Sequence, residues 1–496
     1  MSLKKSFGKS TLWMSAAASG NSVISFLIFI ILSRLLAPAE IGLVAFALII
    51  VELGKIMVSA GLPHAIVRHH EWDERYSATC FYLNLLLATL VTLTVFFIGA
   101  PVIAHYYDPR AELLVQVLSI GFFLEGLKAV HEGKLRREFQ FRAMALRTIA
   151  GSLLGGLTGV ILAFQGYGVW ALVCQQLVNQ FIVLIITVKS ARWLPGLSFS
   201  LPDARALLAF SMPLTAAQMI SNFASKIYEM LVGVLLGPAA LGFFRVGGRA
   251  LFILQEIVLK PFEQTLLPAL SRMTEREQRA QGTLRVIRMA AYFAFPIFFG
   301  AAALGPEFIE FAFTSKWAQS GQVMTFLALG IAPMVVEIQV HSALTASGKS
   351  KQAMILACMN FSLNCLLGLL LVPYGIVAAA AGFALRNYLS VIYTMFVFKK
   401  IFGVSMITQF RTVAPTLAAA AMMFGIVLLV KYALPNDLHL IVRLALLAAI
   451  GAVAYSLIMS CIFRQETKHF LNESAAMAPA KAKPVISKLQ RLLRLA

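Results

Sequence analysis

Long apolar segments separated by short polar connections run through nearly the whole chain. A helix that crosses a bilayer needs about 20 mostly apolar residues. About fourteen segments of the sequence meet this requirement, so the pattern predicts an all-α polytopic membrane protein with about 14 transmembrane helices. The predicted spans are residues 11–34, 41–61, 79–104, 112–130, 143–164, 168–188, 207–235, 240–267, 284–304, 320–346, 352–371, 375–398, 413–433 and 439–463.

A short motif occurs twice, each time between two apolar segments. Residues 35–42 read Leu-Leu-Ala-Pro-Ala-Glu-Ile-Gly, and residues 235–242 read Leu-Leu-Gly-Pro-Ala-Ala-Leu-Gly. An alternative is that turns between membrane helices resemble each other by convergence. Duplicated membrane halves are typical of alternating-access transporters, and we interpret residues 7–200 and 201–400 as two repeats. Weaker echoes at a similar offset pair residues 62–65 with 267–270 and residues 167–168 with 374–375.

The repeats divide the chain into four predicted parts. Residues 1–200 form an N-terminal six-helix half and residues 201–400 a second six-helix half of the same orientation. Residues 401–463 add two membrane helices, and residues 464–496 form a basic cytoplasmic tail. Within this tail, residues 485–495 mix apolar and basic positions at helical spacing, which indicates either an amphipathic helix on anionic membrane lipids or a frayed end.

Composition and charge support a membrane protein rather than a soluble one. The chain is 59% hydrophobic and 13% charged, whereas soluble chains have about 25% charged residues. Its net charge of +20 would suggest nucleic acid in a soluble protein. Here most Lys and Arg residues flank the predicted spans on one side, which places both termini in the cytoplasm and requires no nucleic acid. The five cysteines have no metal-ligand spacing, and we expect no metal and no cofactor.

Charged residues inside the predicted spans give the most direct indication of function. An ionised side chain at the bilayer centre costs about 2.5–3.5 kcal/mol on insertion scales, so it normally faces a cavity or a partner. In the eighth span, five charged residues share an arc of about 60° and extend over roughly 27 Å. We interpret this stripe as the lining of an aqueous cavity. Its members are Arg245, Arg249, Glu256, Lys260 and Glu263.

Other spans carry further charges. An excess of cations there attracts a polyanion, and guanidinium forks suit phosphate oxygens. Carboxylates among them either hold the cations in place or bind H⁺ or Na⁺ for coupling, because a desolvated carboxylate takes up a proton more readily. Glu337, with His341 one turn later, is a candidate proton pair; the alternative is that His341 lies at the membrane interface. The predicted substrate-binding cations are Arg249, Lys260, Arg386, Arg245, Lys55 and Lys226, and the predicted ion-coupling carboxylates are Glu229, Glu256, Glu52 and Glu337.

Some of these charges also have simpler explanations. Glu52 with Lys55, and Lys226 with Glu229, have the i,i+3 spacing of pairs that cancel charge within one helix. Arg245 lies close enough to the end of its span to reach the outer interface.

Four motifs, in this order and spacing, resemble those of a known family. Residues 33–43 resemble the opening of polysaccharide exporters and flippases, and residues 135–141 look like their basic loop after the fourth helix. Residues 166–173 and 267–272 are similar to their sixth-helix start and eighth-helix end. The chain thus resembles the polysaccharide exporters, or Wzx-type lipid-linked oligosaccharide flippases, of the multidrug/oligosaccharidyl-lipid/polysaccharide (MOP) transporter superfamily.

This resemblance implies a multi-pass protein of the bacterial cytoplasmic (inner) membrane that translocates an undecaprenyl-diphosphate-linked oligosaccharide by alternating access. The product would supply exopolysaccharide, capsule or O-antigen assembly, with a polysaccharide polymerase complex as a further partner. At Glu229 the related proteins often carry Asp. The chain contains no nucleotide-binding loop, so we expect an H⁺ or Na⁺ gradient or the membrane potential to supply the energy.

Two other functions are considered. An ion-coupled multidrug exporter of the same superfamily would usually have twelve spans and prefer cations, whereas the predicted cavity is basic. A membrane glycan polymerase or ligase also binds lipid diphosphates, but such enzymes typically carry a large outer loop, and the predicted outer connections are short. We therefore expect a transporter and not an enzyme.

Overall fold

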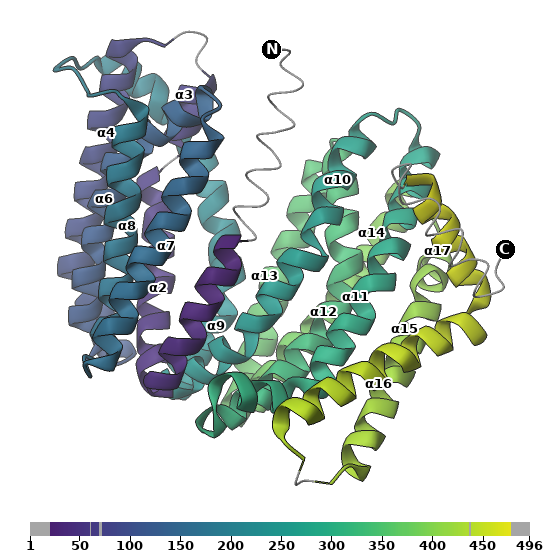
Figure 1. Cartoon of the computed structure of the whole chain (residues 1–496). Helices are drawn as coiled ribbons and strands as arrows, with labels where there is room; N and C mark the ends of the chain where they lie inside the picture. Colours follow the sequence, from purple (N-terminus) through teal and green to yellow (C-terminus); the bar gives the residue numbers. More distant parts are fainter. Residues whose placement is uncertain (1–19, 60, 69–71, 436–437, 478–496) are drawn as a thin grey trace. The chain divides into compact units, whose positions relative to one another are not determined.

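A computed structural model describes residues 20–59, 61–68, 72–435 and 438–477 of the chain (Figure 1). Within these residues the chain is helical and forms two compact units that divide between Val246 and Gly247. The start of the predicted first span and the predicted amphipathic helix at 485–495 lie outside the described residues.

The first unit consists of long apolar helices joined by short turns. Its first described helix, Gly20–Leu35, is followed by α2. The other helices of this unit follow in chain order, and α9 continues past the boundary into the second unit. Their bounds are α2 (Pro38–Ser59), α3 (Leu62–Arg68), α4 (Glu74–Thr94), η1 (Val95–Gly99), α5 (Ala100–Tyr106), α6 (Ala111–Arg137), α7 (Phe141–Phe164), α8 (Val169–Ala191) and α9 (Leu201–Val258).

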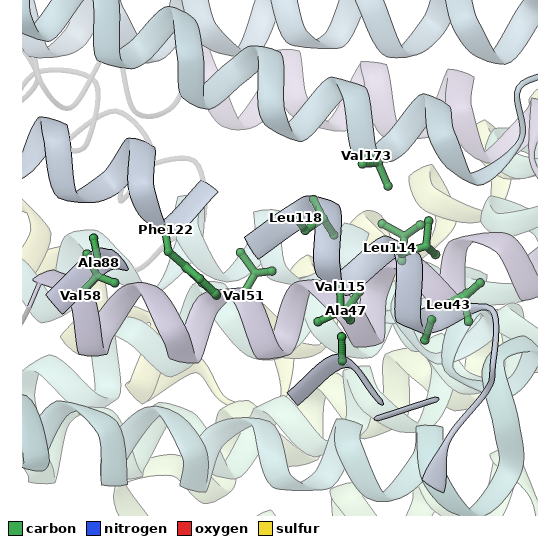
Figure 2. Packing of buried hydrophobic residues seen from close by; sticks show 13 residues of the cluster. Leu43, Ala47, Val51, Val58, Ala88, Leu114, Val115, Leu118, Phe122 and Val173 are labelled. Atoms are coloured by element: carbon green, nitrogen blue, oxygen red, sulfur yellow. The ribbon is translucent and has the colours of Figure 1, made fainter. Parts of the chain in front are cut away.

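Helix α2 is the most buried candidate membrane span that the structure describes in the first unit. It is apolar on nearly all sides, as expected for a helix surrounded by others. Figure 2 shows Leu43 and Val51 of α2 in one buried cluster with Leu118 and Phe122 of α6. A Cβ atom at Gly54 would lie 2.4 Å from the Phe122 ring, so the glycine allows α2 and α6 to pack closely.

Helices α7 and α8 approach each other through a face of glycines. Gly151, Gly155 and Gly159 recur every four residues on α7 and face α8. A Cβ atom at Gly155 would lie only 2.6 Å from the backbone oxygen of Gln175. Small residues at this spacing let membrane helices come into backbone contact, where dispersion forces hold them together.

The two copies of the duplicated motif contact each other in a reciprocal way within the first unit. A Cβ atom at Gly42 would lie 1.7 Å from the carbonyl oxygen of Pro238, and one at Gly242 would lie 2.0 Å from the carbonyl oxygen of Pro38. Between the arms of α9, Gly237 turns the chain with a φ of 82° that favours glycine. Each motif therefore needs its final glycine to accommodate the proline backbone of the other.

The second unit also consists mainly of apolar helices joined by short turns. Its helices are α10 (Lys260–Ser271), α11 (Arg276–Phe313), η2 (Ser315–Trp317), α12 (Ala318–Ala346), α13 (Ser350–Leu371), η3 (Val372–Tyr374), α14 (Ile376–Phe402), α15 (Met406–Ala433), α16 (Leu440–Cys461) and α17 (Arg464–Met477).

Polar side chains fix the packing of the apolar helices α11, α12 and α14. The Thr325 hydroxyl of α12 donates to the carbonyl oxygen of Ala302 at 2.9 Å. The side-chain amide of Asn387 on α14 donates to the carbonyl oxygen of Gly330 at 2.9 Å. Such bonds are favourable inside a membrane protein because lipid offers these groups no partner.

Helix α17 is attached to the first half of α11. The Phe470 ring stacks on Tyr292 with a centroid distance of 3.8 Å. Arg288 of α11 lies 3.6 Å from a carboxylate oxygen of Glu466 and 3.9 Å from one of Glu473. The final described helix is thus anchored by both stacking and charge.

Twelve helical runs among the described residues are long and apolar enough to cross a membrane. One of them, Leu201–Ser271, contains both the predicted seventh and eighth spans, because helical structure continues across the turn at Gly237. The predicted first span is represented by Gly20–Leu35. The prediction of an all-α polytopic membrane protein is confirmed.

Candidate functional site

In the first unit, charged side chains of α9 form ion pairs. Lys226 Nζ lies 3.1 Å from Glu52 Oε2, which connects α9 to α2. Arg245 Nε lies 3.0 Å from Glu229 Oε2, which connects the two arms of α9 across the turn. The i,i+3 spacing instead suggested the pairs Glu52 with Lys55 and Lys226 with Glu229. The observed ion pairs thus tie helical segments together rather than cancelling charge within one turn.

Lys55 is half-buried on α2 and points to α8. Its Nζ atom lies 3.1 Å from the side-chain amide of Gln180, whose oxygen accepts from the ammonium group. Glu125 and Glu52 are acidic neighbours of the same ammonium group. The predicted cation therefore sits among acceptors inside the unit.

A further charged network, which sequence reasoning did not assign to a site, centres on Glu132 of α6. Its carboxylate lies 2.9 Å from Arg147 Nη2, 2.7 Å from Arg136 Nη2 and 3.6 Å from Lys128 Nζ. Arg147 also donates to the Thr187 hydroxyl at 2.8 Å, so the network connects α6, α7 and α8. The motif analysis treated this region as a basic connecting loop. The available signal was the spacing of four between positions 128, 132 and 136, which places these charges on one helix face.

From Arg249 onward the predicted charged stripe lies in the second unit, where it crosses a break between two helices. Helix α9 ends at Val258 and α10 begins at Lys260, with Pro261 in its first turn. Lys260 Nζ donates to Glu256 Oε1 at 2.6 Å across this break. Arg249 is half-buried on α9, before the break. The predicted stripe therefore belongs to two helices rather than to one straight helix.

Arg386 is buried within the second unit on α14, with 8% of the residue exposed. Its guanidinium carbon lies 4.9 Å from the centre of the Phe383 ring, a favourable cation–π distance. It also donates to the Asn387 side chain, which in turn donates to the carbonyl oxygen of Gly330 on α12. This arrangement surrounds the charge with protein.

Glu337 and His341, the candidate proton pair, line one pocket of about 200 Å³ in the second unit. The Ser390 hydroxyl of α14 donates to Glu337 Oε1. A carboxylate, an imidazole, an amide and a hydroxyl around a small volume are suited to a proton or a small cation. Among the described residues, no three His, Cys, Asp or Glu side chains gather as they would around a metal ion. The pocket is lined by Glu263, Glu337, Ile338, His341, Leu356, Asn360 and Thr394.

A family model described as "Polysaccharide biosynthesis protein" matches residues 31–322, more than half of the chain. The chain belongs to this polysaccharide biosynthesis protein family. The resemblance inferred from the sequence motifs is therefore confirmed.

Two proteins named for polysaccharide biosynthesis are similar to this chain. The succinoglycan biosynthesis transport protein ExoT of Rhizobium meliloti is 28% identical over 320 residues, which cover 64% of each chain. The teichuronic acid biosynthesis protein TuaB of Bacillus subtilis is 22% identical over 358 residues, which cover 71% of this chain and 74% of that protein. The similarity thus spans less than two thirds of the length of ExoT.

Solved structures show the fold. The lipid II flippase MurJ in an inward closed conformation matches with a TM-score of 0.75 at 14% identity. The match covers 92% of this chain and 99% of the MurJ chain. An inward-facing multidrug resistance transporter of the MATE family, within the MOP superfamily, matches with a TM-score of 0.60 at 15% identity and covers 77% of this chain and 94% of its own. The protein therefore has the fold of MurJ and of this MATE-family transporter.

Proposed function

We propose that the protein is a flippase that moves an undecaprenyl-diphosphate-linked oligosaccharide from the inner to the outer leaflet of a bacterial cytoplasmic membrane. The family membership and the transport name of ExoT support a role in polysaccharide export. The observation that carries the proposal is the set of paired ionisable side chains on membrane helices of a transporter fold. Such groups are costly in lipid and therefore mark the path of a polar substrate.

The charge balance favours an anionic headgroup. Six predicted site cations, on α2, α9, α10 and α14, outnumber the four predicted site carboxylates by two, and by one when Glu263 of the same stripe is counted. A diphosphate that enters between a lysine and its paired carboxylate takes the place of that carboxylate as the anionic partner of the lysine. The lysine therefore stays paired, which lowers the barrier to passage of the diphosphate. The MOP fold is shared with multidrug exporters, but a net basic lining repels the cations that such exporters would carry.

The proposal includes a topology. We assign fourteen spans, with both termini in the cytoplasm, two repeats of six helices at 1–200 and 201–400, and two additional helices at 401–463. The reciprocal contacts of Gly42 with Pro238 and of Gly242 with Pro38 support the duplication, since related segments are expected to make equivalent contacts. Rocking of the repeats would expose the headgroup path to one leaflet and then to the other.

Binding of the coupling ion by carboxylates would supply the energy for transport. Glu337 and His341 share a pocket with Glu263, and the Ser390 hydroxyl orients Glu337, so an H⁺ or Na⁺ bound there would change the charge beside α14. The further partners that we propose are anionic lipids of the cytoplasmic leaflet and a polymerase complex that consumes the product. No step requires a cofactor.

The test is complementation of polymer production in a strain that lacks its own copy of the protein. Single variants Arg249→Ala, Lys260→Ala and Arg386→Ala are compared with Lys468→Ala, which removes an exposed lysine from α17. The proposal predicts that each site variant lowers polymer yield and causes the lipid-linked oligosaccharide to accumulate in spheroplast membranes, with wild-type protein levels.

Lys468→Ala is expected to restore full production. Full production by all three site variants would refute the proposed site. Loss of drug resistance rather than of polymer, in the same strains, would favour the multidrug exporter.

A further inference from the structure

A pocket of about 520 Å³ opens on the first unit where three elements begin. It lies between the start of α2, the start of α6 with the preceding turn, and the start of α8. In the proposed topology all three starts face the outer side of the membrane. Its volume falls in the range of about 300–1,000 Å³ that is typical of small-molecule sites. The side chains that define its chemistry are Glu40, Arg110, Glu112, Gln116 and Trp170.

The lining of this pocket carries a net negative charge, whereas the predicted substrate-binding site is basic. The Arg110 guanidinium donates to both carboxylate oxygens of Asp108, at 3.0 and 2.8 Å. These bonds hold the pKa of the Asp108 carboxyl below its usual range, so the two charges neutralise each other. Glu40 and Glu112 then leave the lining with a negative charge, which repels a diphosphate.

The polar lining supplies several hydrogen-bond acceptors. One oxygen of Glu40 accepts from the backbone N–H of Ala37 at 2.7 Å, and the amide nitrogen of Gln116 donates to the carbonyl oxygen of Phe96 at 3.4 Å. Two carboxylates and one amide oxygen therefore supply acceptors beside the flat apolar face of Trp170. A ligand with many hydroxyl donors and an apolar ring face matches this combination.

The second repeat shows that the fold does not require these groups. The duplicated motif keeps its proline and glycine in both copies, but Glu40 corresponds to Ala240. Residues 167–168 and 374–375 both read Tyr-Gly, but in the segments that follow them Trp170 corresponds to Val377. The turns thus form with small apolar residues at both positions, and Glu40 and Trp170 are additions specific to the first repeat.

We propose that this pocket binds sugar units of the translocated glycan on the outer side of the membrane. The inference rests on the proposed function and deepens it, because it separates a glycan subsite from the basic path of the diphosphate. Sugar hydroxyls donate to the carboxylate and amide oxygens, while the ring stacks on Trp170. A headgroup that has crossed would be held here by its sugars after its diphosphate leaves the basic side chains.

The experiment is photo-crosslinking in cells that make the polymer, with the full-length chain. The substitution Trp170→p-benzoylphenylalanine places the reactive group in the pocket. Tyr167→p-benzoylphenylalanine, three residues earlier and outside the lining, is the matched control, and Phe383→p-benzoylphenylalanine reports the predicted basic site at Arg386. After irradiation the chain is purified, and the glycan bound to it is measured by acid release and mass spectrometry.

The inference predicts a glycan adduct at position 170, in excess over position 167. Trp170→Ala is expected to lower polymer export, and Trp170→Phe to retain most of it, because the phenyl ring preserves a stacking face. An adduct at 383 without one at 170 would overturn the glycan subsite and leave the flippase proposal intact. Absence of adducts at both positions would overturn both. Equal export losses in Trp170→Ala and Trp170→Phe would also refute a stacking role.

Discussion

The substitution Arg147→Met tests whether the buried charge network stabilises the first unit. Only 7% of the Arg147 side chain is exposed, and the guanidinium contacts Glu132 at 2.9 Å and Thr187 at 2.8 Å. Breaking a buried pair by removing one partner costs about 3–5 kcal/mol. Because Glu132 keeps its contacts with Arg136 and Lys128, we expect the lower value, about 3 kcal/mol.

For a unit of this size, about 1 kcal/mol corresponds to roughly 2–4 °C in melting temperature, so the predicted decrease is about 6–12 °C. The assay is thermal unfolding of the purified full-length chain in lipid nanodiscs, followed by tryptophan fluorescence. The matched control is Arg136→Met, which removes a contact to the same carboxylate from a side chain that is 46% exposed. An exposed pair contributes about 0–1 kcal/mol, or at most about 4 °C. Equal decreases for the two variants, or a larger one for Arg136→Met, would refute the reasoning from burial.

Three further outcomes are expected. Gly42→Ala would place a methyl group 1.7 Å from the carbonyl oxygen of Pro238 and should strongly reduce the amount of folded protein in membranes. Gly425→Ala is the control and should be tolerated, because the space around Gly425 is open. Equal yields of the two variants would contradict the reciprocal packing. Phe470→Ala removes the stack on α11 and should make α17 cleavable by trypsin in inside-out vesicles, and continued protection would show that the ion pairs alone anchor it. Glu337→Gln should abolish the dependence of polymer export on an imposed pH or Na⁺ gradient while leaving the protein folded, and retained dependence would exclude Glu337 as the coupling site.

Apolar length alone located the membrane helices, because a backbone in lipid must satisfy its own hydrogen bonds and therefore becomes helical wherever about 20 apolar residues occur. Periodicity likewise brought Glu337 and His341 together, since positions four apart on a helix share a face. The break at Leu259 was harder to anticipate. Pro261 lies in the first turn of α10 and favours a bend there, but the position of a break also depends on contacts with neighbouring helices.

The partners of the charged residues were the least predictable feature. Glu52 pairs with Lys226, which is 174 residues away, rather than with Lys55 one turn along. Which ion pair forms depends on how neighbouring helices are rotated, and hydropathy does not contain that information. The Glu132 network was missed for the same reason, because Arg147 reaches it from another helix.

The most direct test of the central claim is a leaflet-translocation assay in proteoliposomes that contain the purified chain and a defined undecaprenyl-diphosphate-linked oligosaccharide. Substrate that reaches the opposite leaflet is detected by a membrane-impermeant glycosidase. The account predicts protein-dependent translocation that Arg386→Ala slows and Lys468→Ala does not change. Translocation at the rate of empty liposomes, with folded wild-type protein in the bilayer, would contradict it.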